Sequence, residues 1–335
     1  MSDRQGLMRA MQITELTGPA ALCARSIPVP IDDDARVIVD VRAVGVNFPD
    51  LLMTYGRYQM QVPVPFVPGV EVAGVVAAAP RGCSSKVGDE VVAFCTQLGG
   101  YAERVAVDPA MVADKPAELD FGEAAALLAN FQTVHFAMTR RVQVRVGQTV
   151  LVLGAGGGIG TAAIQIAKML GAEVIAVVRR TGIADRLVAL GADHVVPLTP
   201  GWSREVRGLT DGAGVDYVLD PVGGAAFDEA VRTLAVEGHL LVIGFASGEG
   251  IPAVKVNRLL LRNVAVDGVA WGEYLVGHPE AFVESVYELR ALVANGFRPY
   301  ISTRFPIAEA AKALGALERG AIVGKAVLEL GDANW

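Results

Sequence analysis

Residues 149–168 read Thr149-Val-Leu-Val-Leu-Gly154-Ala-Gly-Gly-Gly-Ile-Gly160-Thr-Ala-Ala-Ile-Gln-Ile-Ala-Lys168. Val150 to Leu153 form a short apolar run without helical spacing, which predicts a strand buried on both faces of a parallel sheet. Glycines follow at close intervals, and the apolar residues after them contain no helix breaker. Glycines permit a tight turn that brings backbone amides close to a pyrophosphate, and a helix N-terminus attracts its negative charge. The strand, turn and helix therefore predict a dinucleotide-binding site.

The spacing Gly154-x-x-Gly157-x-x-Gly160 departs from strict Gly-x-Gly-x-x-Gly. A loop that merely turns the chain is the alternative interpretation. The preceding strand and the following helix are the context that favours cofactor binding. We therefore expect the cofactor phosphates to contact the loop residues Gly154, Gly156, Gly157, Gly158, Ile159 and Gly160.

The next strand indicates which dinucleotide is bound. NAD-binding folds place an acid at the end of this strand, where it bonds the ribose hydroxyls. Here the strand reads Glu173-Val-Ile-Ala-Val-Val-Arg179-Arg180 and ends in two arginines. Guanidinium groups suit a 2′-phosphate, although a solvated charge pair is the alternative. We expect NADPH to be preferred over NADH.

Composition limits the class of protein. The 335 residues are enough for about two domains. Hydrophobic residues make up 52% and charged residues 19%, and the formal net charge is -7. Scattered Lys and Arg argue against a nucleic-acid surface. The three cysteines form no CxxC pair, and neither a signal peptide nor a membrane-length apolar run is evident. We expect a soluble, cytoplasmic protein with no nucleic-acid or membrane partner.

The chain changes character near residue 120. Residues 8 to about 120 read as short strands broken by turns, which predicts a barrel-like β region. Asp120 with Glu123 is a capping-box signal for a helix. Strand–helix alternation then predicts a doubly wound parallel sheet. The predicted strands are 194–197, 215–220, 239–243 and 263–269, and the predicted helices are 183–190, 202–209 and 227–235. The tail holds helices 279–294 and 308–318 and a strand 326–330 that is expected to rejoin the first region.

Seven segments in this order resemble the medium-chain dehydrogenase/reductase superfamily, and in detail its zinc-free quinone oxidoreductase branch, which includes zeta-crystallin. The resemblance implies an α/β protein with a GroES-like β-barrel catalytic domain (1–128 and 270–335) and an inserted Rossmann domain (129–269). It also implies an active site in the cleft between them. The segments are Gly45-Val-Asn-Phe-Pro-Asp50, Pro68-Gly-Val-Glu-Val-Ala-Gly-Val-Val76, Val87-Gly-Asp-Glu-Val91, Gly99-Gly-Tyr-Ala-Glu103, the glycine loop, Asp220-Pro-Val-Gly-Gly224 and Gly244-Phe-Ala-Ser-Gly248.

The same resemblance predicts no metal. Zinc-dependent relatives place Cys, His and Cys where this chain has Asn47, Val70 and Ala129, and none of these is a normal zinc ligand. Without a Lewis acid, substrates that delocalise developing negative charge themselves are favoured. We therefore expect an enzyme, an NADPH-dependent reductase of quinones or other conjugated carbonyl compounds. An enoyl-thioester or 2-alkenal reductase and a non-catalytic NADPH-binding structural protein are the alternatives.

Four residues are predicted to serve the reaction. The Asn47 amide is suited to bonding the nicotinamide ribose or the substrate oxygen, unless it only satisfies its own turn. By resemblance Tyr58 matches a tyrosine near the substrate in quinone reductases and the proton-donating tyrosine of related enoyl-thioester reductases, with a packing tyrosine as the alternative. Asp50 matches a supporting acid. Thr133 matches a threonine at the nicotinamide end, with a helix threonine bonding its own backbone as the alternative.

Further cofactor contacts are predicted where strands of the sheet end. They are Asp220, Val222, Gly223, Phe245, Ala246 and Ser247. Gly324 and Lys325 match the family's closing Gly-Lys near the cofactor, although Lys325 is equally compatible with a solvated surface charge. Residues 263–269 are a candidate edge strand for a homodimer.

Overall fold

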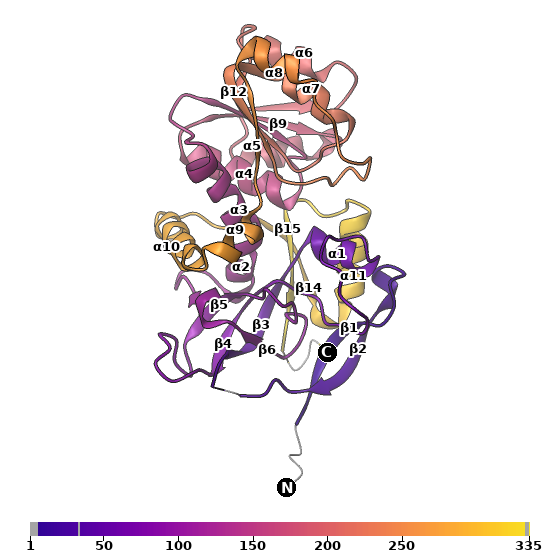
Figure 1. Cartoon of the computed structure of the whole chain (residues 1–335), viewed down its shortest axis with the longest axis vertical. Helices are drawn as coiled ribbons and strands as arrows, with labels where there is room; N and C mark the ends of the chain where they lie inside the picture. Colours follow the sequence, from indigo (N-terminus) through magenta and orange to yellow (C-terminus); the bar gives the residue numbers. More distant parts are fainter. Residues whose placement is uncertain (1–5, 33, 332–334) are drawn as a thin grey trace. The chain divides into compact units, whose positions relative to one another are not determined.

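The computed structural model describes residues 6–32, 34–331 and 335. The chain forms two compact units, one made of Met1–Ala129 with Leu275–Trp335 and the other of Asn130–Tyr274. The domain limits expected from the sequence, 128/129 and 269/270, lie one and five residues before these divisions. Figure 1 follows the chain through both units. In the described part of the chain, no helix has both the length and the apolar character needed to cross a membrane.

The first unit is built on a seven-stranded sheet of mostly antiparallel strands. Its order is β14-β15-β3-β4-β5-β7, and β6 also pairs with β3. The C-terminal strand β15 lies antiparallel to β3, with Ala326 opposite Val46, which confirms the expected return of the tail. The strands are β3 (Val37–Val46), β4 (Glu71–Ala78), β5 (Glu90–Phe94), β6 (Arg104–Val107), β7 (Val112–Asp114), β14 (Ile301–Pro306) and β15 (Lys325–Glu329), and a separate antiparallel pair is formed by β1 (Leu7–Ile13) and β2 (Leu22–Pro28).

Short helices connect these strands. The capping box expected at residue 120 is present, because Asp120 Oδ1 accepts the N–H of Glu123 at 2.8 Å and Glu123 accepts the N–H of Asp120 at 3.0 Å. The helix α1 was not expected from the sequence, although Asn47 at its N-cap and proline in its first turn are ordinary start signals. The helices are α1 (Phe48–Thr54), α2 (Phe121–Ala126), α10 (Glu280–Ala294) and α11 (Ala310–Glu318), and α9 (Trp271–Gly277) begins in the second unit and ends in the first.

The second unit contains a six-stranded parallel sheet, as the strand–helix alternation predicted. Its order is β10-β9-β8-β11-β12-β13. Numbered from β8, this is the 3-2-1-4-5-6 order of the Rossmann fold, in which ligands bind where the order reverses, between β8 and β11. The strands are β8 (Thr149–Leu153), β9 (Glu173–Val178), β10 (His194–Pro197), β11 (Val215–Asp220), β12 (Leu234–Val242) and β13 (Ala265–Gly268).

The sheet is buried between helices. Leu151 and Ile175 from the strands pack in one apolar cluster with Phe227 and Val206 from the helices, which explains the continuous apolar runs of the strands. The helices are α3 (Thr133–Phe136), α4 (Gly158–Met169), α5 (Ala184–Ala189), α6 (Trp202–Leu209), α7 (Ala225–Thr233) and α8 (Val256–Arg262), and π-helical turns occupy Leu128–Gln132 and Ala137–Arg141.

One predicted helix was wrong at its end. Residues 227–235 were expected to be helical, but α7 ends at Thr233 and β12 begins at Leu234. Leu234 is extended because it pairs with Val215 of β11. This tertiary pairing overrides the helix propensity of leucine and alanine.

Candidate functional site

The glycine loop lies at the point where the strand order reverses. Strand β8 ends at Leu153, and α4 begins after its N-cap, Gly157. A β-carbon on Gly160 would overlap the backbone of Gly154 and Ala155, and one on Gly154 would lie 2.8 Å from Val222. Gly154 also has a positive φ of 58°. The turn therefore closes only with hydrogen at these positions, and it directs the N-terminus of a 12-residue helix to the carboxyl end of the sheet.

Asp220 ends the neighbouring strand and holds a second loop beside the glycines. Its Oδ1 accepts the N–H groups of Val222 and Gly223, both at 2.8 Å. Its Oδ2 is buried and has no hydrogen-bond partner within the described residues. Burial raises the pKa of this carboxyl group. A buried orphan oxygen at the carboxyl end of a parallel sheet is the kind of group that a bound ligand satisfies.

A third loop is tied to the Asp220 loop by backbone hydrogen bonds. Ala246 donates to the carbonyl of Pro221 at 3.0 Å, and Ser247 donates to that of Val222 at 2.9 Å. Phe245 lies after β12 and directly before these two residues, and its side chain is 42% exposed. The structure thus brings together three of the predicted cofactor segments: the glycine loop, residues 220–223 and residues 245–247.

The two arginines follow the end of β9, which is the neighbour of β8 in the sheet. Both Arg179 and Arg180 are exposed. This is the position at which the fold places the group that reads the adenosine ribose.

Residues before α4 add a group that the sequence did not reveal. The side-chain amide of Asn130, a buried residue in the first π-helical turn, lies against Gly158, so that a β-carbon there would overlap its Nδ2. Thr133, half-buried, begins α3 a few residues later. The sequence could not predict this contact, because Asn130 and Gly158 are far apart in the chain and the burial of Asn130 depends on the tertiary structure.

In the first unit, five polar residues form a buried cluster, here called the polar centre: Asn47, Asp50, Glu71, Tyr101 and Lys325. All are at most 5% exposed. The ammonium of Lys325 donates to Asn47 Oδ1 at 2.6 Å and also to Glu71 Oε1. The Nδ2 group of Asn47 donates to Glu71 Oε1 at 2.8 Å. The other oxygen of Glu71 accepts the N–H of Ala129 at 2.5 Å.

Asp50 completes the polar centre. Its carboxylate accepts the N–H of Asn47 at 2.9 Å and that of Gly69 at 3.1 Å, and the hydroxyl of Tyr101 lies 3.4 Å away. Desolvation raises the pKa of Asp50 to about 7, although the backbone bond from Asn47 and the charge of Lys325 oppose the rise. The group therefore titrates near neutral pH.

The polar centre contains three predicted residues and two that were missed. Asn47 does more than satisfy its own turn, because its amide is bonded to Glu71 and Lys325. The interpretation of Lys325 as a surface charge was wrong, since the residue is 2% exposed. Glu71 and Tyr101 lie within the quoted motifs, but an isolated glutamate or tyrosine in a strand-rich sequence gives no sign of burial.

Tyr58 lies on the segment after α1 and is half-buried. Its carbonyl accepts from Gln61 Nε2 at 2.5 Å. The nearby Tyr55 is engaged differently, because its hydroxyl donates to Glu318 at 2.6 Å, which raises its pKa. The Tyr55 hydroxyl is thus bound to a carboxylate of α11.

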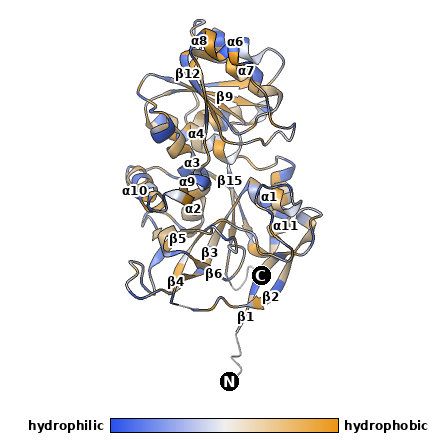
Figure 2. Cartoon of the chain, in the orientation of Figure 1, coloured by the Kyte–Doolittle hydropathy of each residue, from blue (hydrophilic) through white to orange (hydrophobic). Residues whose placement is uncertain are grey.

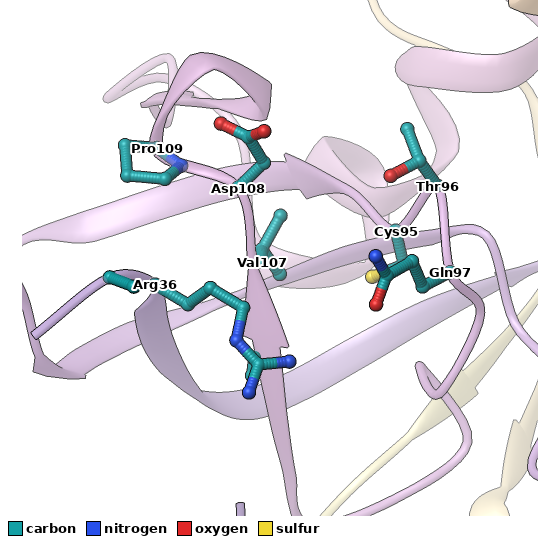
Figure 3. Close-up of a pocket in the computed structure, with 9 residues that line it drawn as sticks. Arg36, Cys95, Thr96, Gln97, Val107, Asp108 and Pro109 are labelled. Atoms are coloured by element: carbon teal, nitrogen blue, oxygen red, sulfur yellow. The ribbon is translucent and has the colours of Figure 1, made fainter. Parts of the chain in front are cut away.

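A pocket of about 140 Å³ lies elsewhere in the first unit, at the ends of β5 and β6. Figure 3 shows Arg36, Gln97 and Asp108 around it, with Cys95 at its edge. None of its lining residues belongs to the polar centre.

Comparison with known proteins identifies both parts of the chain. Residues 33–117 match the alcohol dehydrogenase GroES-like domain, and residues 158–291 match the zinc-binding dehydrogenase family. The quinone oxidoreductase-like protein 2 of Bos taurus is 34% identical over 96% of this chain and 92% of its own length. A probable oxidoreductase from Mycobacterium abscessus is 52% identical, with a TM-score of 0.90 over 97% of this chain and 100% of that one. Escherichia coli quinone oxidoreductase, solved with NADPH, is 26% identical, with a TM-score of 0.87 over 96% and 100% of the two chains.

The zinc named in the description of one family model does not fit this chain. Asn47, Val70 and Ala129 provide neither thiolate nor imidazole, and the cation bound to Asn47 and Glu71 is the ammonium of Lys325. The fold, the matching domains and the relatives agree with the resemblance seen in the sequence. The chain is an oxidoreductase that belongs to the zinc-free quinone oxidoreductase branch of the medium-chain dehydrogenase/reductase superfamily.

Proposed function

We propose that this protein is an NADPH-dependent reductase of quinones or other conjugated carbonyl compounds that needs no zinc. The glycine loop, Asp220 and residues 245–247 bind the cofactor at the switch point of the sheet, and Arg179 with Arg180 binds the 2′-phosphate. NADPH, when bound, supplies the hydride. The complex of the E. coli relative with NADPH supports this choice of cofactor.

The observation that carries the proposal is the chemistry of the polar centre. It holds an amide, two carboxyl groups and an ammonium where zinc-dependent relatives are expected to hold a metal. Among these groups the Asn47 amide can donate a hydrogen bond to an enolate or quinol oxygen, which stabilises its charge without a Lewis acid. In this proposal Asn47 donates to the substrate oxygen, Asp50 supports Asn47 through its backbone N–H, Tyr58 supplies the proton, and Thr133 contacts the nicotinamide end.

The test is NADPH oxidation by the purified protein with EDTA present, against 1,4-naphthoquinone, an enone and crotonyl-coenzyme A, with NADH as the control. Turnover that survives EDTA and is faster with NADPH is expected. Loss of activity in EDTA would contradict the zinc-independent chemistry. A strong preference for crotonyl-coenzyme A would instead identify an enoyl-thioester reductase. Binding of NADPH without any turnover would overturn the reductase assignment.

We further propose that two copies pair through the edge of the parallel sheet. Strand β13 is an edge strand of the parallel sheet. On α8, which precedes it in the chain, Val256, Leu260 and Leu261 are 74%, 75% and 78% exposed. In Figure 2, α8 carries orange, hydrophobic positions beside blue, hydrophilic ones. An unpaired strand edge is a template for pairing with another chain, and an exposed apolar patch can mark a protein–protein interface. Light scattering should give a dimer for the wild type and a monomer for Leu260→Glu with Leu261→Glu; a wild-type monomer would contradict the pairing.

We also propose a cytoplasmic location. Cys23, Cys83 and Cys95 are all free thiols, which suits a reducing compartment. Fractionation of the native host with an antibody to the protein would test this.

A further inference from the structure

Two of the three positions at which zinc-dependent relatives are expected to hold metal donate hydrogen bonds to one carboxylate, that of Glu71. Asn47 donates to Glu71 through its side chain, and Ala129 donates to it through its backbone N–H. Val70 directly precedes Glu71 in the chain. The cation bound to this carboxylate is the ammonium of Lys325, which comes from the start of β15.

These contacts permit only one orientation of the Asn47 amide. An ammonium can only donate hydrogen bonds, and an ionised carboxylate can only accept them. The oxygen of Asn47 must therefore face Lys325, and its NH₂ group must face Glu71. The second NH₂ hydrogen bond goes to the carbonyl of Gly45 at 3.4 Å, which is long for such a bond. This contact is the one that a ligand oxygen can most easily replace.

The ammonium also changes the strength of the amide as a donor. A charged donor on the amide oxygen polarises the group and strengthens the hydrogen bonds of its N–H. Glu71 balances the charge of Lys325, which makes the burial of both tolerable. The pair thus places an ammonium on the oxygen of Asn47 without leaving an unpaired ion in the core.

We infer that Lys325 is a positioning residue whose ammonium is the cation of the polar centre, in the place of the metal. It holds Asn47 by the oxygen, so that an Nδ2 hydrogen is available to the oxygen on which negative charge develops. This rests on the proposed function, in which Asn47 meets that oxygen. Lys325 acts through Asn47 and does not touch the substrate.

The test is the double variant Lys325→Met with Glu71→Gln, which removes both buried charges together and avoids leaving one unpaired. The double variant Lys312→Met with Glu309→Gln removes an exposed Lys–Glu pair of the same unit, whose charged atoms are 2.9 Å apart, and is the matched control. We expect kcat with 1,4-naphthoquinone to fall about 10- to 100-fold in the first double variant. We expect its Kd for NADPH to stay within about twofold of wild type, because in this inference the Lys325 ammonium binds Asn47 and Glu71 rather than the cofactor. The control should match the wild type in both.

A second readout does not depend on activity. The side-chain amide of Asn47, assigned in ¹H–¹⁵N spectra by its loss in Asn47→Asp, should exchange slowly with solvent in the wild type. It should exchange faster and shift in the Lys325–Glu71 double variant. An unchanged kcat, or an unchanged amide signal, would overturn the inference.

The two readouts separate the two proposals. Should the wild type oxidise no NADPH with any acceptor, the proposed function fails, and the Asn47 signal alone judges the role of Lys325. If the double variant does not fold, the exchange rate of the Asn47 amide in the wild-type spectrum tests the inference. An Asn47 amide that exchanges as fast as that of the exposed Asn257 would contradict the locked orientation.

Discussion

Gly45 on β3 leaves room for the carboxylate of Glu71 on β4, because a β-carbon at position 45 would overlap Oε1 of Glu71. The two residues belong to two of the motifs that identify the superfamily in the sequence. Glu71 in turn binds Asn47, Lys325 and the backbone of Ala129. The glycine is thus required by the buried charge cluster rather than by its own backbone conformation.

Gly45→Ala should therefore destabilise the protein. The methyl group forces the Glu71 carboxylate away from its partners, and overpacking of this kind costs about 1–3 kcal/mol. Guanidinium unfolding should show the loss. Gly208→Ala, at an exposed helix position with open space around it, should leave the protein as stable as wild type or slightly more stable. Equal stability of Gly45→Ala and wild type would show that Glu71 is not confined as described.

Glu71→Gln should be more damaging than an equivalent change on the surface. It leaves the buried ammonium of Lys325 without its counter-charge, and breaking a buried pair costs about 3–5 kcal/mol. Glu309→Gln, which removes the exposed partner of Lys312, should cost about 0–1 kcal/mol. Comparison of the two unfolding midpoints is the measurement. Similar midpoints would mean that Lys325 finds another partner or reaches solvent.

Asp50 should make stability depend on pH between about 4 and 7. Its pKa is raised from 3.8 to about 7 in the folded protein, so in this interval the folded state binds more protons than the unfolded state. The free energy of unfolding therefore falls as pH rises from 4 to 7 and then levels off, by up to about 4 kcal/mol for three pKa units. Asp50→Asn should remove this contribution.

The measurement is guanidinium unfolding of wild type and Asp50→Asn at pH 5 and pH 8. The wild type should lose stability relative to the variant between these two values. Parallel changes in both proteins would show that the carboxyl group is already ionised at pH 5.

Gly160→Ala should weaken NADPH binding. Its β-carbon would overlap the backbone of Gly154 and Ala155, and backbone cannot rotate away as a side chain can. The loop must shift at the helix N-terminus that faces the phosphates, and we expect Kd to rise about tenfold or more, equivalent to 1.4 kcal/mol. Fluorescence titration with NADPH measures this. Gly182→Ala has open space around it and should bind as the wild type does; equal binding by both variants would contradict the role of the glycine loop.

Arg179→Ala with Arg180→Ala should reduce the preference for NADPH. Both side chains are exposed after β9, and loss of charge-assisted bonds to a 2′-phosphate should weaken NADPH binding about tenfold or more while affecting NADH little. Arg204→Ala, an exposed arginine of the same unit, is the control. The ratio of the two dissociation constants is the readout. An unchanged ratio would place the 2′-phosphate elsewhere.

Much of the fold followed from local signals. These signals act within a few residues of the chain. The structure confirms the strand predicted at Val150 to Leu153, the turn and helix predicted after it, and the capping box of Asp120 with Glu123. The end of α7 could not be predicted in this way, because Leu234 is extended only through its pairing with Val215. Helix α1 was also not predicted, because a helix of seven residues is too short to show a clear hydrophobic periodicity.

The sequence by itself determined the class of cofactor loop, the strand–helix order of the second unit and the lack of thiolate or imidazole at positions 47, 70 and 129. All of these depend on residue type or short-range spacing. Tertiary structure decided what the remaining polar residues do. Asn47 and Glu71 are 24 residues apart, Glu71 and Ala129 are 58 apart, and Glu71 and Lys325 are 254 apart. A lysine usually lies at the surface, since burying its charge is unfavourable unless a counter-charge is present. Only the pairing of β15 with β3 and of β3 with β4 brings that counter-charge to Lys325.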